Sequence, residues 1–198
     1  MFKRKKGYLL LTMLVLTGLA GRIHSDTLSG KERRNLVNEL KTSRTAFLKS
    51  FQGLSKKQLR FRSNKHQLSI EECVHRAAVF ENALWSASTI ALQQSSHQSQ
   101  VTEDSLLPTR FYEYMNNCSL YLHSGKKQDF QDALTLYNNE RDAALRYART
   151  TTENVRGHFM QTAWGKLDVY QLMLMISFSS NYFTRQIESI KSSPSFPR

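Results

Sequence analysis

Apolar residues recur at intervals of three and four through four long stretches of this chain, and few segments alternate as strands do. In the first stretch these positions are Leu36, Val37, Leu40, Phe47, Phe51 and Leu54. The wide step from Leu40 to Phe47 has the polar residues Ser43 and Arg44 at its middle. Further stripes lie in residues 69–94, in residues 127–150 and from Leu167 onward. Four amphipathic helices without a strand signal predict an all-α bundle.

Local signals mark where these helices begin and what connects them. Ser29 to Glu32 and Ser69 to Glu72 have the spacing of capping boxes, which predicts helix starts at both places. The aromatic-rich segment from Pro108 to His123 predicts a short extra helix over one end of the bundle. The segment from Thr151 to Trp164 is interpreted as a connector before the last helix.

The N-terminus has the organisation of a secretory signal. Lys3 to Lys6 is a basic region, and Tyr8 to Leu19 is an apolar run too short to span a bilayer, which takes about 20 residues. Small residues favour cleavage before Gly21, and a cut after Ser25 is the second choice. We therefore expect a signal peptide in residues 1–25, a bundle domain in residues 26–198, and a periplasmic or extracellular location. An uncleaved signal anchor is the alternative.

The net charge of the chain limits the classes of partner that it is expected to bind. The formal net charge is +12, and five of the basic residues lie before residue 26. The other basic residues are scattered, so the sequence indicates a basic surface with some affinity for anionic surfaces rather than a nucleic-acid site. We expect no nucleic acid as partner, and contact with a membrane only through an uncleaved signal.

Two motifs resemble those of the DinB-like family, four-helix bundles that commonly hold a divalent metal with three histidines. The first is Leu68-Ser69-Ile70-Glu71-Glu72-Cys73-Val74-His75-Arg76, and the second is Gly165-Lys166-Leu167-Asp168-Val169-Tyr170-Gln171, which continues to Arg185-Gln186-Ile187. The stretch from Leu54 to Arg62 is similar to a third part of the pattern. The resemblance covers residues 28–94 and 125–198. It implies an up-down-down-up bundle with a long connection between helices 2 and 3.

The resemblance also implies that the metal ligands have been replaced. The family's histidines fall seven residues after the serine of the Ser-Ile pair, and seven and three residues before the Gln-Ile pair. Arg76, Ser179 and Phe183 occupy these positions here. A guanidinium has no lone pair for a metal, a phenyl ring has no donor, and a lone serine is a poor neutral ligand. We therefore expect no metal and no other cofactor.

In place of the metal, the resemblance implies a plugged cavity with a lining of Arg76, Glu81, Ser179 and Phe183. Phe183 continues the apolar stripe of the last helix, so its ring is expected to point into the bundle. Glu81 is either an exposed carboxylate at the edge of its helix or the partner of Arg76 or Arg185 in a salt bridge across the former metal cavity.

The two cysteines, Cys73 and Cys118, leave two alternatives open. In an oxidising compartment they can form a disulfide, which in the chain-entropy model stabilises by roughly 4 kcal/mol. Otherwise they are buried thiols, and Cys73 lies on an apolar helix face that suits one.

The sequence does not identify a ligand. We expect an exported, non-catalytic binding or interaction module, with an unknown small ligand and with a homodimer as a candidate assembly. Met175 and Phe178 fall off the main stripe of the last helix and would lie on the dimer face. The alternatives are a metal-dependent enzyme similar to the family's thiol transferases, with unidentified ligands, and an envelope protein held by its N-terminus.

Overall fold

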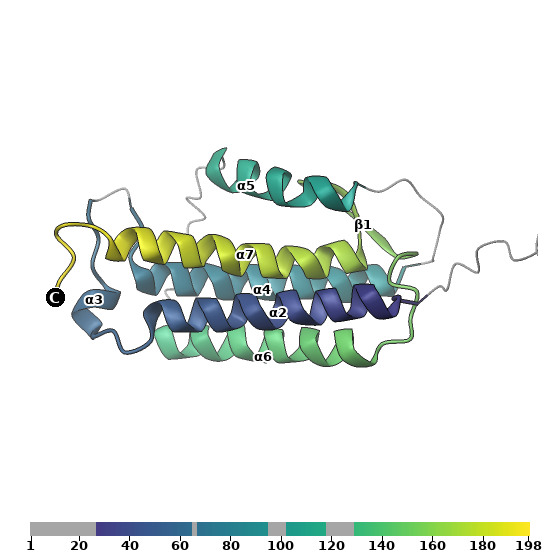
Figure 1. Ribbon diagram of the computed structural model, residues 1–198, viewed down its shortest axis with the longest axis horizontal. Coiled ribbons are helices and arrows are strands. Elements are labelled where there is room, and N and C mark those ends of the chain that lie inside the picture. Colours follow the sequence, from purple (N-terminus) through teal and green to yellow (C-terminus); the bar gives the residue numbers. More distant parts are fainter. Residues whose placement is uncertain (1–26, 65–66, 95–101, 118–128) are drawn as a thin grey trace, which may run out of the picture.

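Four long helices, two running in each direction, form the body of the protein (Figure 1). The computed structural model describes residues 27–64, 67–94, 102–117 and 129–198. The long helices are α2 (Gly30–Phe51), α4 (Ile70–Leu92), α6 (Phe130–Thr150) and α7 (Val169–Lys191). In Figure 1, α2 and α7 run in one direction and α4 and α6 in the other. The all-α bundle is confirmed, and the directions follow the up-down-down-up order that the resemblance implied.

The helices begin where side chains can cap them. Ser29 and Ser69 are the N-caps of α2 and α4, and each closes a capping box with the glutamate three residues on, as predicted. Asp168 caps α7 in the same manner with Gln171. A further box, from Ser55 to Gln58, starts the short helix α3 (Lys56–Leu59). These caps satisfy backbone N–H groups that would otherwise lack partners.

A β-hairpin that the sequence did not predict begins in the segment interpreted as a connector and continues to Asp168. Strand β1 (Phe159–Thr162) pairs antiparallel with β2 (Gly165–Asp168), with Phe159 opposite Asp168. Gly165 has φ 112°, and a Cβ there would lie 2.8 Å from Thr102 Oγ1, so the position favours glycine twice over. Because β2 takes up Leu167, α7 starts two residues later than predicted.

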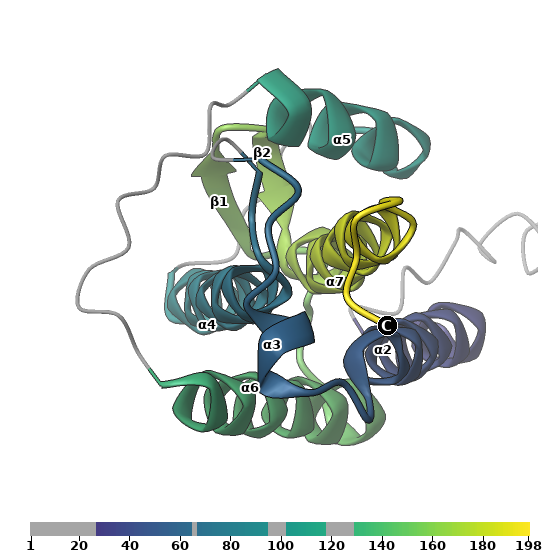
Figure 2. The same ribbon diagram turned by 90° about the vertical axis from the view of Figure 1, so that its left-hand side faces the viewer.

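The predicted extra helix is present, but it lies along α7 rather than over one end of the bundle. A 3-10 turn, η1 (Asp104–Leu106), leads into α5 (Leu107–Asn117), and residues 118–128 lie outside the described ranges. Its buried face consists of Leu107, Phe111 and Met115. Figure 2 shows α5 on the outer side of α7, with α2 and α4 on the inner side. The early turns of α7 are therefore buried on every side.

This arrangement removes the argument for a dimer face on α7. Met175 is fully buried, and Phe178 is half-buried with its ring 6.4 Å from that of Phe111 on α5. Met175 lies in the core of its own chain, and Phe178 packs against that core. The homodimer itself stays a prediction. In the described residues no helix has the length and hydropathy that crossing a bilayer demands.

Candidate functional site

A salt bridge between Glu81 on α4 and Arg141 on α6 lies at the centre of the bundle. Both side chains are fully buried. Arg141 Nε donates a hydrogen bond to Glu81 Oε1, and Arg141 Nη2 donates to Oε2 at 2.8 Å. The guanidinium and the carboxylate thus meet through two parallel N–H···O bonds, the strongest geometry for this pair.

The remaining N–H groups of Arg141 reach the other two helices. Nη1 donates to the Leu40 carbonyl at 2.7 Å and to Ser43 Oγ at 3.0 Å, both on α2. Nη2 donates to Ser180 Oγ on α7 at 2.7 Å, and this hydroxyl also lies 3.0 Å from the Tyr137 hydroxyl. A guanidinium has five N–H groups, and each has an acceptor here. The centre is a closed polar network to which all four helices contribute.

Burial and the opposite charge act against each other in this pair. Burial raises the pKa of Glu81, and the charge of Arg141 opposes that rise. Burial also lowers the pKa of Arg141, but the Glu81 carboxylate outweighs it and leaves the pKa above its ordinary value. Since the guanidinium stays protonated and donates two hydrogen bonds to the carboxylate, both members of the pair are ionised.

The partner of Glu81 therefore corrects both sequence hypotheses. Glu81 is neither exposed at a helix edge nor paired with Arg76 or Arg185. The Arg185 guanidinium instead lies over the Tyr112 ring of α5, 4.9 Å from its centroid. Arg141 was missed as a central residue, although it interrupts the apolar stripe of its helix.

Two of the three expected ligand positions carry side chains that are fully buried. Phe183 is fully buried, as predicted, and its ring lies 5.9 Å from Phe80 and 5.3 Å from Tyr182. Ser179 is buried too, and its hydroxyl donates to the Ile176 carbonyl of its own helix at 2.9 Å. Arg76 is half-buried on α4. Across the described ranges, no group of three or more His, Cys, Asp or Glu side chains could hold a metal ion.

A second ionic cluster joins the chain segments at the start of α7. Arg156 forms salt bridges with Glu32 at 2.9 Å, Asp104 at 2.8 Å and Asp168 at 2.8 Å, and its guanidinium lies 4.0 Å from the Tyr170 ring centroid. Burial raises the pKa of the Asp168 carboxyl to about 6, against the opposing charge of Arg156. These partners come from α2, η1 and the N-cap of α7, so the cluster fastens the hairpin end of the bundle.

Cys73 is buried and forms no disulfide within the described residues. Burial raises its pKa to about 12. Cys118 lies outside the described residues, so its pairing with Cys73 stays a prediction.

We expect Cys73 to be unreactive in the folded protein, because the thiolate is the nucleophile and burial disfavours it. The Cys118→Ser variant isolates this thiol. At pH 8 its reaction with a thiol reagent such as 5,5′-dithiobis(2-nitrobenzoate) should be slow, and denaturant should make it fast. Rapid labelling of the native variant would show that Cys73 is accessible.

No protein-family model, curated protein or solved structure matches this chain.

Proposed function

We propose that this protein is an exported, non-catalytic binding module, a DinB-like bundle that has lost its metal site. The proposal rests on the side chains that occupy the expected metal-ligand positions. A phenyl ring fills the bundle at Phe183, and the Ser179 hydroxyl bonds to its own helix. The phenyl ring has no ligand atom, and a lone buried serine hydroxyl is a poor neutral ligand for a metal.

The central network supports the same proposal. A catalytic acid or base has to reach the proton that it transfers, through direct contact or through one water. Glu81 and Arg141 have no exposed surface, and their bonds end on groups of the bundle itself. The polar groups at the centre therefore stabilise and align the helices. A ligand or partner would bind on the outer surface of the bundle.

Export is part of the proposal and rests on the basic region and apolar run at the N-terminus, which lie outside the described residues. In the exported form the chain would begin at Gly21 or Asp26, just ahead of α2.

The proposal predicts that untagged protein purified from its native compartment contains far less than one zinc, nickel or iron per chain. Elemental analysis tests this. The positive control is the variant Arg76→His, Ser179→His and Phe183→His, which restores the imidazoles that the resemblance implies and is expected to gain metal.

About one metal ion per native chain, removable by a chelator with loss of stability, would contradict the proposal and favour the thiol-transferase-like enzyme. A folded triple variant that gains no metal would show that these residues do not occupy former ligand positions.

A further inference from the structure

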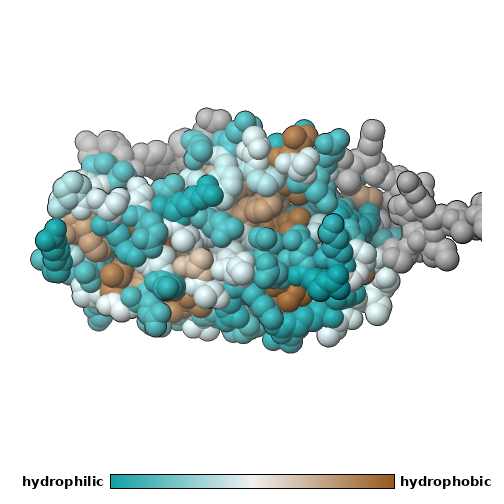
Figure 3. Space-filling model, viewed as in Figure 1, coloured by the Kyte–Doolittle hydropathy of each residue, from teal (hydrophilic) through white to brown (hydrophobic). Residues whose placement is uncertain are grey.

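A basic groove runs along the outer side of the bundle between α2 and α6. It consists of two adjoining hollows of about 340 and 440 Å³, which share Lys41 and Arg149. Its basic lining residues are Arg33, Arg34, Lys41, Arg44, Arg146 and Arg149. Asp142 is the one acidic residue among the residues that line the two hollows. In Figure 3, strongly hydrophilic residues gather over this part of α2 and α6.

Two of the six basic side chains form hydrogen bonds or salt bridges within the protein. Arg33 donates to the carbonyls of Ala148 at 2.8 Å and Thr151 at 2.7 Å, which are C-terminal carbonyls of α6. Arg44 pairs with Asp142 and donates to Asn138 Oδ1 at 2.8 Å. These contacts hold α2 against α6 and neutralise the only carboxylate of the groove.

The other four cations are exposed and uncompensated. They are Arg34 and Lys41 on α2, and Arg146 and Arg149 on α6. Within the described part of the chain, none of these four side chains donates a hydrogen bond or forms an ion pair. Unpaired like charges repel one another, so a groove of this kind is more stable when anions lie in it.

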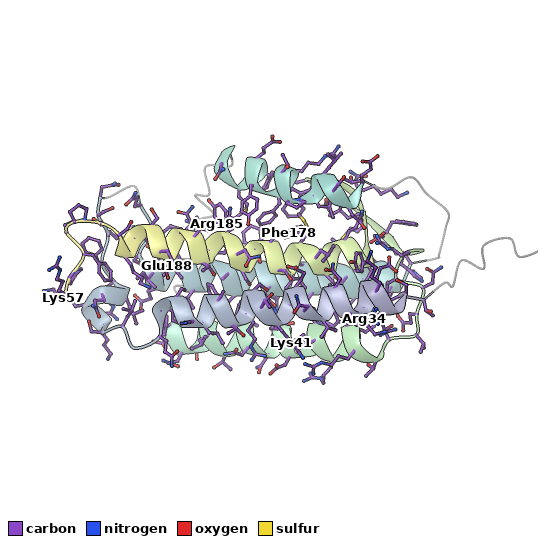
Figure 4. The ribbon with its side chains drawn as sticks, in the orientation of Figure 1. Arg34, Lys41, Lys57, Phe178, Arg185 and Glu188 are labelled. Atoms are coloured by element: carbon purple, nitrogen blue, oxygen red, sulfur yellow. The ribbon has the colours of Figure 1, made fainter. Side chains whose placement is uncertain are left out.

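The spacing of these cations favours an extended anionic surface over a single small anion. Arg34 and Lys41 are seven residues apart, so they lie about two turns, or roughly 10 Å, from each other on one face of α2. Figure 4 shows both along α2, on the side of the bundle away from α5. Val37 and Leu145 lie between the basic side chains as an apolar floor. The charges line a groove and do not converge on one point.

The position of the groove in the chain indicates what that surface is. Arg34 follows the apolar run from Tyr8 to Leu19 by only 15 residues, so this end of the bundle would lie close to a bilayer for as long as that run stays attached, as in the uncleaved-signal alternative. Anionic lipids attract basic side chains near their surface. We propose that the groove between α2 and α6 binds the phosphodiester headgroups of an anionic membrane surface. This inference names a ligand for the binding module proposed above.

Co-sedimentation of the full chain with lipid vesicles tests the proposal. Vesicles of phosphatidylcholine mixed with phosphatidylglycerol carry the anionic headgroups, and vesicles of phosphatidylcholine alone measure binding through the apolar run. The test variant is Arg34→Glu with Lys41→Glu. The matched control is Lys56→Glu with Lys57→Glu, which changes the net charge equally on α3, at the other end of α2 (Figure 4).

We expect the native chain to bind the anionic vesicles more tightly than the neutral ones, and added salt to weaken that preference. Each basic residue near an anionic surface is worth about five-fold in affinity, so the test variant should lose about 25-fold or more. The control variant should lose much less. All three proteins should unfold at the same denaturant concentration, since the four residues are exposed. If the test variant unfolds early, Arg146→Gln with Arg149→Gln replaces it.

Equal losses in the test and control variants would overturn the proposal, because net charge alone would then explain binding. Equal binding to neutral and anionic vesicles would overturn it as well. Release of the protein from vesicles by millimolar glycerol phosphate would show a site for a free phosphate ester instead of a membrane surface. A preference for an acidic protein over vesicles would likewise reject it. None of these outcomes affects the metal content, so the two proposals fail separately.

Discussion

Replacing Arg141 by methionine is expected to lower the free energy of unfolding by about 3–5 kcal/mol. The methionine fills much of the same space, but it leaves the Glu81 carboxylate buried without its partner. A buried, unpaired charge costs far more than the lost attraction, because the carboxylate cannot recover its hydration. Glu81 has no exposed surface through which water could reach it.

Denaturant unfolding of the variant and of the parent measures this difference. Arg146→Met is the matched control, since Arg146 is exposed on the next turns of α6, and it should change stability little. The double variant Glu81→Leu with Arg141→Met should recover most of the loss, because it removes both charges together. If Arg141→Met is as stable as the control, the pair is not buried as described.

Replacing Phe183 by alanine is expected to destabilise the bundle by about 3–5 kcal/mol, the usual cost of a cavity left by a core phenyl group. The ring is fully buried and packs against Phe80 and Tyr182, which belong to two different long helices. The relaxation of these neighbours can fill only part of the space.

Thermal or denaturant unfolding tests this prediction as well. Val79→Ala serves as the control, because Val79 is 42% exposed on α4 and creates no interior cavity. Phe183→Leu should fall between the parent and Phe183→Ala. An unchanged melting temperature for Phe183→Ala would place the ring outside the core and would invalidate the helix register on which the lost metal site depends.

The bundle could be predicted from the sequence because each helix carries its own evidence. The apolar spacing shows which face is buried, and the boxes starting at Ser29 and Ser69 show where two helices begin. Phe183 could be placed in the core for the same reason. The hairpin was missed because its strands have four residues each, too short a run to show an alternating pattern.

The central network was not predicted, although the apolar stripes of the helices are interrupted at the positions of its polar residues. The stripes of α2, α6 and α7 have wide steps where Ser43, Arg141 and Ser180 stand. In the structure Ser43 and Ser180 both accept hydrogen bonds from Arg141, which also donates to Glu81. A stripe reports the burial of one helix and carries no information on its axial alignment with another. The sequence therefore offered Arg76 and Arg185 as partners for Glu81 and gave no reason to choose Arg141.

The central network also has a consequence for the order in which the molecule can be completed. Ser180 on α7 accepts one of the bonds from Arg141, and α7 is the last helix in chain order. A nascent chain that lacks α7 leaves a guanidinium donor without its acceptor and exposes the apolar faces of the three earlier helices. Such a chain cannot complete the native packing of the bundle during synthesis. If the chain is exported as proposed, this dependence on α7 would delay completion of the bundle until most of the polypeptide has crossed the membrane.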